Sequence, residues 1–302
     1  MKIQFLNGGL ANQAFQYIFA RYYELSFPWD TIYLDDSYFT LYTVHNGYEL
    51  ERVFGIRPHM LSECFSEDVW QYILEERQKG KSTPQILLDN GIDIMMVTDQ
   101  DKNHRGLNPF NGRSHEVRSG EFVPEVYEMA ENVYYYGYWI NYQWFADYKN
   151  EFLQEFQFPP IRDERNLKYA EQIRSSNVVS VHIRRGDYVS LGWAWDPEQH
   201  QNSINTFLTQ APGSWHGFIF SDDIAWCRAH ERELGLRDFA KITYVEGNTQ
   251  EESFRDMQLM SMCQGMILSN SAFSYLASLL NTEKKYVLSV KGRAVQSNKT
   301  GT

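Results

Sequence analysis

The most chemically active residues of the chain stand together in one short segment, VHIRRGDY (residues 181–188), which contains His182, Arg184, Arg185 and Asp187. Two adjacent guanidinium groups need anionic partners, because an unpaired buried charge is costly. The planar fork of arginine suits the oxygens of a diphosphate. An internal salt bridge between arginine and aspartate, beside a histidine of the core, explains the same residues, so this segment leaves two interpretations open.

Polar residues also follow two other apolar runs, in FSDD (residues 220–223) and in SNSAFS (residues 269–274). One aspartate of the first pair is expected to cap a helix, which leaves the other to accept hydrogen bonds from a base such as guanine. Residues 271–274 open a helix whose N–H groups predict an anion site, with an ordinary serine cap as the alternative. Together, the three segments predict one nucleotide-diphosphate site formed by His182, Arg184, Arg185, Asp222, Asp223, Ser269, Asn270, Ser271 and Ser274.

The carboxyl half of the chain alternates short apolar runs with amphipathic stretches, as parallel βαβ units do. The predicted strands span residues 178–183, 217–221, 242–245, 266–269 and 286–290, and the predicted helices span residues 223–234, 250–263 and 271–281. Thr249 and Glu252 have the spacing of a capping box before the second of these helices. Because ligands of open α/β sheets bind at the carboxyl ends of the strands, this Rossmann-like half is expected to gather the three polar segments at one edge.

The amino half begins in the same way, with a predicted strand at residues 2–6, a turn at residues 7–10 and a helix at residues 12–25. The turn lacks the GxGxxG spacing of dinucleotide-binding folds, which disfavours NAD as a ligand. Asn12 and Gln13 are expected to offer amide donors to a bound nucleotide. A tight structural turn before a capped helix is the alternative.

Two consecutive prolines, Pro159 and Pro160, predict a domain boundary, because paired prolines stop helices and stiffen linkers. Residues 1–160 and 161–302 are therefore interpreted as two Rossmann-like domains. Within the first domain, residues 76–120 carry many charges and few aromatic rings, which predicts an excursion at the surface.

The composition is that of an acidic folded protein, since 28 Lys+Arg and 39 Asp+Glu give a net charge of −11. This balance disfavours nucleic acid as a partner, because such affinity depends on basic residues at phosphates. Two adjacent arginines and a helix start are still expected to make a locally positive site. The sequence has no apolar run of the ~20 residues that span a bilayer. The three cysteines, Cys64, Cys227 and Cys263, are odd in number and far apart, which is typical of the reduced thiols of a cytosolic protein. We therefore predict a cytoplasmic protein without an integral membrane segment.

Four segments resemble the bacterial α-1,2-fucosyltransferase family: GGLANQAFQY (residues 8–17), VHIRRGDY, FSDD and DMQLMSMC…SNSAFSYLASLL (residues 256–280). The resemblance implies an α/β fold of the GT-B type, with two Rossmann-like domains facing across a cleft, the first on the acceptor side and the second binding the donor. It implies transfer of L-fucose from GDP-fucose to the 2-hydroxyl of a terminal β-galactoside, with inversion, in glycan or O-antigen biosynthesis. No metal or other cofactor is implied. The chain departs from the family pattern at Ala11, Ala14, Gln264, Tyr275 and Leu276, which puts acceptor preference in question.

By the same resemblance, His182 and one of Asp222 and Asp223 hold guanine, while Arg184 binds the β-phosphate. Arg184 and Asp187 are the predicted catalytic residues. Arg184 would stabilise the charge that builds on the leaving group. Asp187 would either accept the proton of the acceptor hydroxyl or orient Arg184, and both roles stay open.

The acceptor sugar is expected to contact aromatic rings, since galactose presents a C–H face to them. The aromatic segment at residues 134–148 offers Tyr138 and Trp139 for this role, and most of its other rings are expected in the core. Asp196, Glu198 and His200, placed in a loop after the arginine segment, are weaker candidates for the base.

Two rival functions remain open. One is a catalytically silent module that binds a GDP-sugar. The other is a metal-dependent glycosyltransferase of the GT-A type, which would use the DxD pair Asp99 and Asp101. With a lipid-linked acceptor, the cytoplasmic enzyme would lie at the periphery of the inner membrane.

Overall fold

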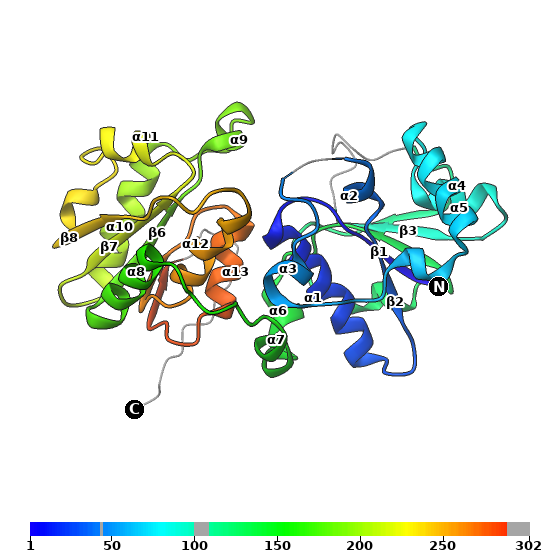
Figure 1. Cartoon of the computed structure of the whole chain (residues 1–302), viewed down its shortest axis with the longest axis horizontal. Helices are drawn as coiled ribbons and strands as arrows, with labels where there is room; N and C mark the ends of the chain where they lie inside the picture. The colour runs from blue at the N-terminus through cyan, green and yellow to red at the C-terminus, as the bar shows by residue number, and fades with distance from the viewer. Residues whose placement is uncertain (43–44, 100–108, 289–302) are drawn as a thin grey trace. The chain divides into compact units, whose positions relative to one another are not determined.

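The computed structural model describes residues 1–42, 45–99 and 109–288. The chain divides into two compact units, Met1–Gln157 and Phe158–Thr302, each built on a five-stranded parallel sheet (Figure 1). The division falls directly before the two prolines at which the sequence predicts a boundary. Within the described ranges, no helix combines the length and apolar character that crossing a membrane requires.

The second unit contains the sheet that positions the predicted nucleotide site. Its strands are β6 (Val178–Ile183), β7 (His216–Ser221), β8 (Lys241–Tyr244), β9 (Gly265–Ile267) and β10 (Tyr286–Leu288), in the order β10-β9-β6-β7-β8. Strand β6 is central and all of its residues are buried, as its β-branched sequence predicts. The five predicted strands are confirmed, with ends that shift by one or two residues, and residues 289–290 lie outside the described ranges.

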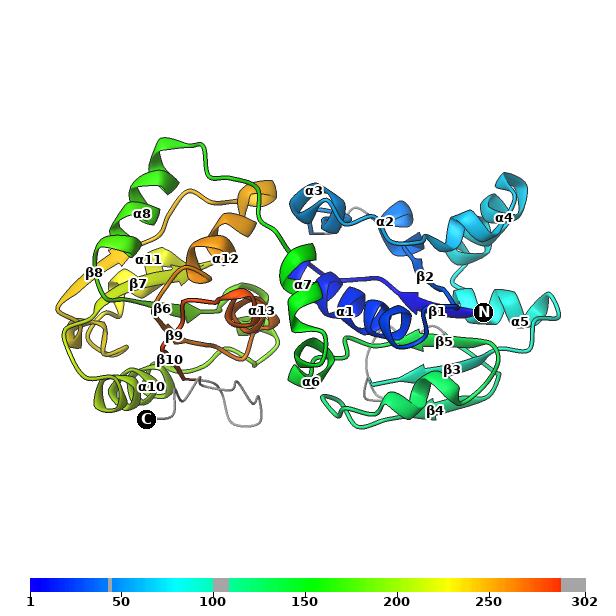
Figure 2. The same cartoon turned by 90° about the horizontal axis from the view of Figure 1, so that it is seen from below.

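Helices cover both sides of this sheet, with α8 and α12 on one side of it and α10 on the other (Figure 2). The helices are α8 (Glu164–Ser175), α9 (Gly186–Ser190), α10 (Pro197–Gln210), α11 (Ile224–Ala229), α12 (Phe254–Met260) and α13 (Ala272–Leu280), with 3₁₀ turns at Leu236–Asp238 and Gln250–Glu252. Helix α11 is shorter than predicted, and α13 is confirmed to within one residue at each end.

Two helix starts differ from the sequence prediction. The capping box expected at Thr249 is wrong, because its side chain makes no capping bond and the predicted helix is split into a 3₁₀ turn and α12. A capping box instead begins α10, where the carboxylate of Asp196 accepts from the backbone N–H of Gln199 (2.9 Å). Residues 196–200 are therefore the start of a helix and not the predicted loop.

The first unit has the strand order β2-β1-β5-β3-β4. The strands are β1 (Lys2–Phe5), β2 (Ile32–Asp35), β3 (Met95–Thr98), β4 (Ser114–Glu116) and β5 (Val133–Tyr136). The helices are α1 (Leu10–Ser26), α2 (Ser37–Leu41), α3 (Leu50–Phe54), α4 (Glu67–Gln78), α5 (Thr83–Asp89), α6 (Tyr142–Ala146) and α7 (Lys149–Glu155), with 3₁₀ turns at Leu61–Cys64 and Pro124–Glu128.

The surface excursion predicted at residues 76–120 is wrong for its described part, because β3 lies inside the sheet and Val97 is fully buried. The short run MMVT lacks the alternation that marks a strand.

Aromatic side chains fill the interior of the first unit. Trp139 is 1% exposed, and its ring stacks on that of Phe19 with centroids 4.2 Å apart. The indole N–H of Trp139 donates to Oε1 of Gln4 (2.8 Å), and Trp144 meets Phe19 edge-on. Much of the aromatic segment is therefore core, as predicted, because rings of this size contribute strongly to apolar burial.

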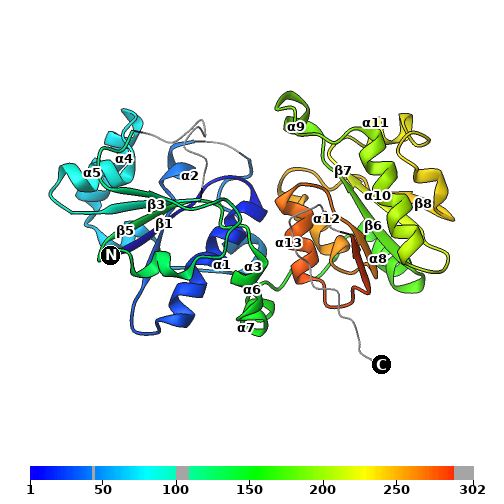
Figure 3. The ribbon, with the colours of Figure 1, turned by 180° about the vertical axis from the view of Figure 1, so that it is seen from behind.

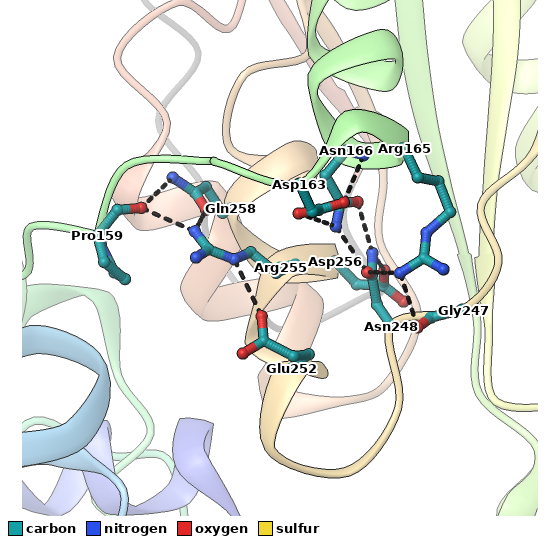
Figure 4. Close-up of polar contacts among 10 residues, drawn as sticks. All are labelled: Pro159, Asp163, Arg165, Asn166, Gly247, Asn248, Glu252, Arg255, Asp256 and Gln258. Carbon is teal, nitrogen blue, oxygen red and sulfur yellow. Dashed lines mark hydrogen bonds and ion pairs between the residues drawn. The ribbon is translucent and has the colours of Figure 1, made fainter.

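A polar network joins the first turn of α8 to the loop after β8 (Figure 4). The side chains of Asn166 and Asn248 exchange two hydrogen bonds of 2.8 and 2.9 Å. Asn248 also donates to Oδ1 of Asp256 (2.8 Å), and Arg165 donates to the carbonyl of Gly247 (2.9 Å). Burial raises the pKa of Asp256 to about 7, against the opposing effects of Asn248 and Arg165.

A second group of contacts fixes the chain where the second unit begins. Nη1 of Arg255 and Nε2 of Gln258 donate to the carbonyl of Pro159 at 2.8 and 3.0 Å (Figure 4). Nε of Arg255 also pairs with Glu252 at 3.2 Å, which orients the guanidinium. Two donors from α12 therefore hold the entry to this unit at one carbonyl.

Replacing Asp256 with asparagine is expected to stabilise the protein at alkaline pH and not at acidic pH. Burial raises the pKa of this carboxyl, so the folded state keeps the proton up to about pH 7, whereas the unfolded chain releases it at about pH 4. Stability therefore falls as pH rises between these values, and asparagine, which keeps an acceptor for Asn248, removes that loss. Because a difference of one in pKa corresponds to about 1.4 kcal/mol, urea unfolding should show a gain of up to about 4 kcal/mol at pH 8 and almost none at about pH 3.5.

The matched control for this substitution is Asp238→Asn, which alters an exposed aspartate of the same unit. It is expected to change the free energy of unfolding by less than about 0.5 kcal/mol at either pH. An Asp256→Asn variant that is no more stable than the wild type at pH 8 would contradict the raised pKa.

Candidate functional site

The turns after β6, β7 and β9 meet at the carboxyl edge of the second sheet, because these three strands are neighbours. Helices α9 and α11 begin at this edge (Figure 3). Nδ1 of His182 and Oγ of Ser269 are 2.8 Å apart, which joins β6 to the turn after β9. Nη1 of Arg184 lies 2.9 Å from Oδ2 of Asp222, which joins β6 to the turn after β7. The structure thus brings together the three segments that the sequence analysis singled out.

Arg184 is held between two carboxylates. Nη2 donates to Oδ1 of Asp187 (2.5 Å), while Nη1 pairs with Asp222. Gly186 permits the approach of Asp222, since a Cβ on this glycine would lie 2.6 Å from Oδ2. Of the two partners Asp187 is the more exposed, with 53% of its side chain accessible against 27% for Asp222. Asp187 thus makes the contact that would orient Arg184, and the role of Asp187 as a base stays a prediction.

Arg185 is fixed by an aromatic ring and a carboxylate. Its guanidinium carbon lies 3.5 Å from the centroid of the Trp226 ring, and its Nε lies 3.5 Å from Oδ2 of Asp223. Oδ1 of Asp223 accepts from the N–H of Trp226 (3.0 Å), so this aspartate caps α11, as predicted for one of the pair. Asp222 accepts from the backbone N–H of Arg185 (2.8 Å). Both aspartates therefore contact the arginine segment, and the binding of guanine by one of them stays a prediction.

The charge at this edge differs from the expectation. Three carboxylates surround two guanidinium groups, so the cluster as a whole is negative rather than locally positive. The Nε atoms of Arg184 and Arg185 are nevertheless buried without a hydrogen-bond partner among the described residues. Nε of Arg185 lies near Asp223, but this contact is an ion pair that lacks hydrogen-bond geometry. Buried N–H groups of this kind cost free energy until an acceptor satisfies them.

His182 is a neutral histidine of the core. Burial lowers its pKa to about 3, and the charges of Arg184 and His200 act in the same direction. Its ring lies beside that of Phe273, with centroids 5.7 Å apart. At neutral pH this imidazole is too weak a base to accept a proton from a hydroxyl, although it can still form hydrogen bonds with a ligand.

The serine turn after β9 is held together by its own hydroxyls. Oγ of Ser271 accepts from the N–H of Phe273 (3.2 Å) and caps α13, and Oγ of Ser269 accepts from the N–H of Ser271 (3.2 Å). Oγ of Ser274 accepts from the N–H of Ser269 (3.3 Å). The serine-cap alternative is therefore present, and binding of an anion at this turn stays a prediction. Asn270 donates from Nδ2 to the carbonyl of Trp193 (2.8 Å), outside the turn.

In the first unit, Gln13 serves the fold. Its Nε2 donates to the carbonyls of Gly8 (3.0 Å) and Gly47 (2.9 Å), and its Oε1 accepts from the N–H of Glu49 (2.8 Å). Both N–H groups are used within the unit, so Gln13 offers no donor to the predicted nucleotide. Asn12 is half-buried at the start of α1, and its role at the nucleotide stays a prediction.

The residues predicted to bind the acceptor are organised by a buried carboxylate. Asp99 accepts from the backbone N–H groups of Tyr138 (3.0 Å) and Trp139 (2.7 Å). The Trp139 ring lies in the core and presents no surface to a sugar, which corrects the expectation for this residue, while Tyr138 is half-buried. Asp101, the second residue of the DxD pair, lies outside the described residues. In the described part of the chain, no group of three or more His, Cys, Asp or Glu side chains is placed to hold a metal ion.

Comparison with known proteins identifies the family. Residues 103–298 match the family described as Glycosyl transferase family 11. The chain belongs to this family. It is 30% identical over 298 residues to an alpha-1,2-colitosyltransferase of Escherichia coli, and the alignment covers 94% of this chain and 88% of that protein. It is 28% identical over 159 residues to a galactoside 2-alpha-L-fucosyltransferase of Bos taurus, covering 48% of this chain and 41% of that protein.

The fold of this family 11 glycosyltransferase is also seen in a solved structure. A crystal structure of the alpha-1,6-fucosyltransferase NodZ, soaked with GDP-fucose, matches 92% of this chain and 91% of NodZ with a TM-score of 0.51 and 15% identity. The GT-B type of fold, with two Rossmann-like units, is thereby confirmed. The family resemblance inferred from the sequence motifs is confirmed as well.

Two aromatic side chains at the site of this family 11 member were not predicted. Trp226 lies against Arg185, and the ring of Tyr188 lies 5.3 Å from the guanidinium carbon of Arg184. Trp226 stands three residues after Asp223, so the spacing of one helical turn is a signal that could have found it. The position of Tyr188 depends on the short helix α9, for which the sequence gives no comparable pattern.

The weaker base candidates lie at the start of α10. The Asp196 carboxylate is bound to the N–H of Gln199 as a helix cap, and Glu198 is exposed. His200 is 2% exposed, and burial lowers its pKa to about 4, helped by the charge of Arg185. His200 is therefore a poor base at neutral pH.

Proposed function

We propose that this glycosyltransferase moves L-fucose from GDP-fucose to the 2-hydroxyl of a terminal β-galactoside, with inversion and without a metal ion. The names of its relatives support the sugar and the linkage, since they include an alpha-1,2-colitosyltransferase and a galactoside 2-alpha-L-fucosyltransferase. The observation that carries the proposal is the arginine pair after β6, at the ligand-binding edge of the sheet, whose two buried Nε groups have no hydrogen-bond acceptor among the residues that the structure describes. We place the reaction in glycan or O-antigen synthesis on the cytoplasmic side of the membrane.

The diphosphate of the donor would displace Asp187 from Arg184. The cluster is already negative, so a phosphate can be added only where a carboxylate leaves. Asp222 is fixed by the backbone N–H of Arg185 and by its close fit against Gly186, whereas Asp187 is more exposed and lies in the five-residue helix α9. The β-phosphate would therefore take the place of Asp187 at Nη2 of Arg184.

The displaced carboxylate would then act on the acceptor. The oxygen of the acceptor 2-hydroxyl attacks C1 of fucose on the face opposite GDP, and the bond between C1 and the β-phosphate oxygen breaks with its electron pair on GDP. Arg184 and Arg185 stabilise the charge that builds on the β-phosphate. Asp187 accepts the proton of the hydroxyl, so its two predicted roles follow one another.

The test of the function is turnover of GDP-fucose with lactose in the presence and absence of EDTA. Because arginines replace a metal in this proposal, we expect the rate to be unchanged by EDTA and the product to carry α-1,2-linked fucose, as NMR of the trisaccharide will show. Loss of activity in EDTA that manganese restores would favour the GT-A alternative. GDP binding without transfer or hydrolysis would favour the silent module.

A second donor is supported by one observation, the relative that transfers colitose and matches most of the chain. Colitose lacks the 3-hydroxyl of fucose. A site that hydrogen-bonds this hydroxyl discriminates strongly against the deoxy sugar, whereas a site without such a bond does not. The ratio of kcat/KM for GDP-fucose and GDP-colitose decides between the two donors.

A further inference from the structure

Three large apolar side chains are exposed within five residues of α9 and the turn after it. Val189, Leu191 and Trp193 are 52%, 51% and 54% exposed. The turn is held in place, because the N–H of Trp193 donates to the carbonyl of Tyr188 (2.8 Å) and Nδ2 of Asn270 donates to the carbonyl of Trp193 (2.8 Å). An exposed indole whose main chain is held by hydrogen bonds on both sides is suited to bind a ligand.

The same indole is connected to the arginine of the proposed donor site. The rings of Trp193 and Tyr188 meet edge-on with centroids 5.6 Å apart, and the Tyr188 ring lies 5.3 Å from the guanidinium carbon of Arg184. Asn270, which holds the Trp193 carbonyl, belongs to the turn after β9. Trp193 is therefore tied to two of the turns at which we place the donor.

We propose that Trp193 is the platform on which the acceptor sugar stacks. The inference rests on the proposed function and adds the residue that binds the acceptor. In the transfer, the acceptor oxygen must lie within about 3.5 Å of the reacting carbon, so the acceptor ring has to bind close to the group that holds the phosphate. The C–H face of a β-galactoside matches an exposed indole, while its hydroxyl groups stay in water. Trp193 thus takes the role that the sequence assigned to the buried Trp139.

The test compares Trp193→Ala and Trp193→Phe with Trp29→Ala in the full chain. Trp29 is the matched control, because it is 82% exposed but lies between α1 and β2 in the other unit. The KM for lactose and N-acetyllactosamine should rise about tenfold in Trp193→Ala, the loss expected for one stacking contact, and should recover in part in Trp193→Phe. The Kd for GDP should stay constant, and Trp29→Ala should match the wild type.

Binding of the same disaccharides to the GDP-loaded protein, followed by saturation-transfer NMR, separates the two proposals. Binding that depends on Trp193 in a protein that transfers no fucose would support the platform and refute the proposed function. Fucose transfer with the same acceptor KM in the wild type and Trp193→Ala would refute the platform alone. Loss of binding to phospholipid vesicles in Trp193→Ala, with an unchanged acceptor KM, would assign the patch to a membrane and overturn the platform. A wild type that neither binds nor fucosylates these disaccharides would overturn it too.

Discussion

Arg184→Ala is expected to lower kcat for fucosyl transfer by about a thousandfold, because it removes the guanidinium that we propose stabilises the leaving β-phosphate. The contact strengthens as the bond to C1 breaks, so kcat should fall more than the affinity for GDP. Part of the loss follows from charge alone, since Asp187 and Asp222 would then face the diphosphate without Arg184 between them. Turnover of GDP-fucose with lactose and the Kd for GDP, measured by calorimetry, check both statements.

Arg184→Lys and Arg237→Ala complete this experiment. Lysine keeps the charge but cannot contact Asp222 and a phosphate in the same plane, so we expect it to restore only a small part of the activity. Arg237 is an exposed arginine of the same unit that pairs with Glu231 at 3.5 Å, and its loss should leave kcat unchanged. Full activity in Arg184→Ala would remove the basis of the proposed mechanism.

The second sheet and its edge were predictable because the signals are local. Strand β6 is a β-branched run that is buried along its whole length, and each polar segment directly follows a strand. In a parallel sheet, such segments must meet at the carboxyl edge. The contacts of His182 with Ser269 and of Arg184 with Asp222 are consequences of the strand order β9-β6-β7.

The partners of individual side chains were not predictable in the same way. The sequence indicates that one aspartate caps α11, but the pairing of Asp222 with Arg184 depends on the space that Gly186 leaves across two turns. Trp139 illustrates the same limit. It follows a glycine and stands in an aromatic segment, yet its burial depends on Phe19 and Gln4, more than a hundred residues earlier in the chain.

The missed elements show which signals are weak. Strand β3 has four residues without alternation, so no period distinguishes it from a loop. Helix α10 had a clear signal in the cap formed by Asp196 and Gln199, with Pro197 at the first helical position. The capping box expected at Thr249 has the right spacing, but Gln250 adopts a positive φ of 51° and the chain there forms only a 3₁₀ turn.

Asp187→Asn is expected to reduce kcat by about a hundredfold while the Kd for GDP stays constant or falls. Asparagine cannot accept the proton of the acceptor hydroxyl, which accounts for the slower transfer. It is also neutral, so it competes less with the β-phosphate for Nη2 of Arg184, which accounts for the affinity. Steady-state transfer to lactose and calorimetry with GDP measure the two effects separately.

Asp222→Asn provides the contrast, because Asp222 binds Arg184 and the backbone N–H of Arg185 at the same time. Its substitution should disturb the position of both guanidinium groups and weaken GDP binding. If Asp187 only oriented Arg184, the two variants would behave alike, with a weaker affinity for GDP in both. If Asp187 leaves Arg184 when the donor binds, Asp187→Asn should lose kcat without losing affinity for GDP, and Asp222→Asn should not show this pattern. The comparison therefore distinguishes this behaviour from that of a carboxylate that stays with the arginine. The exposure of Asp187 and the fixed position of Asp222 favour the first behaviour.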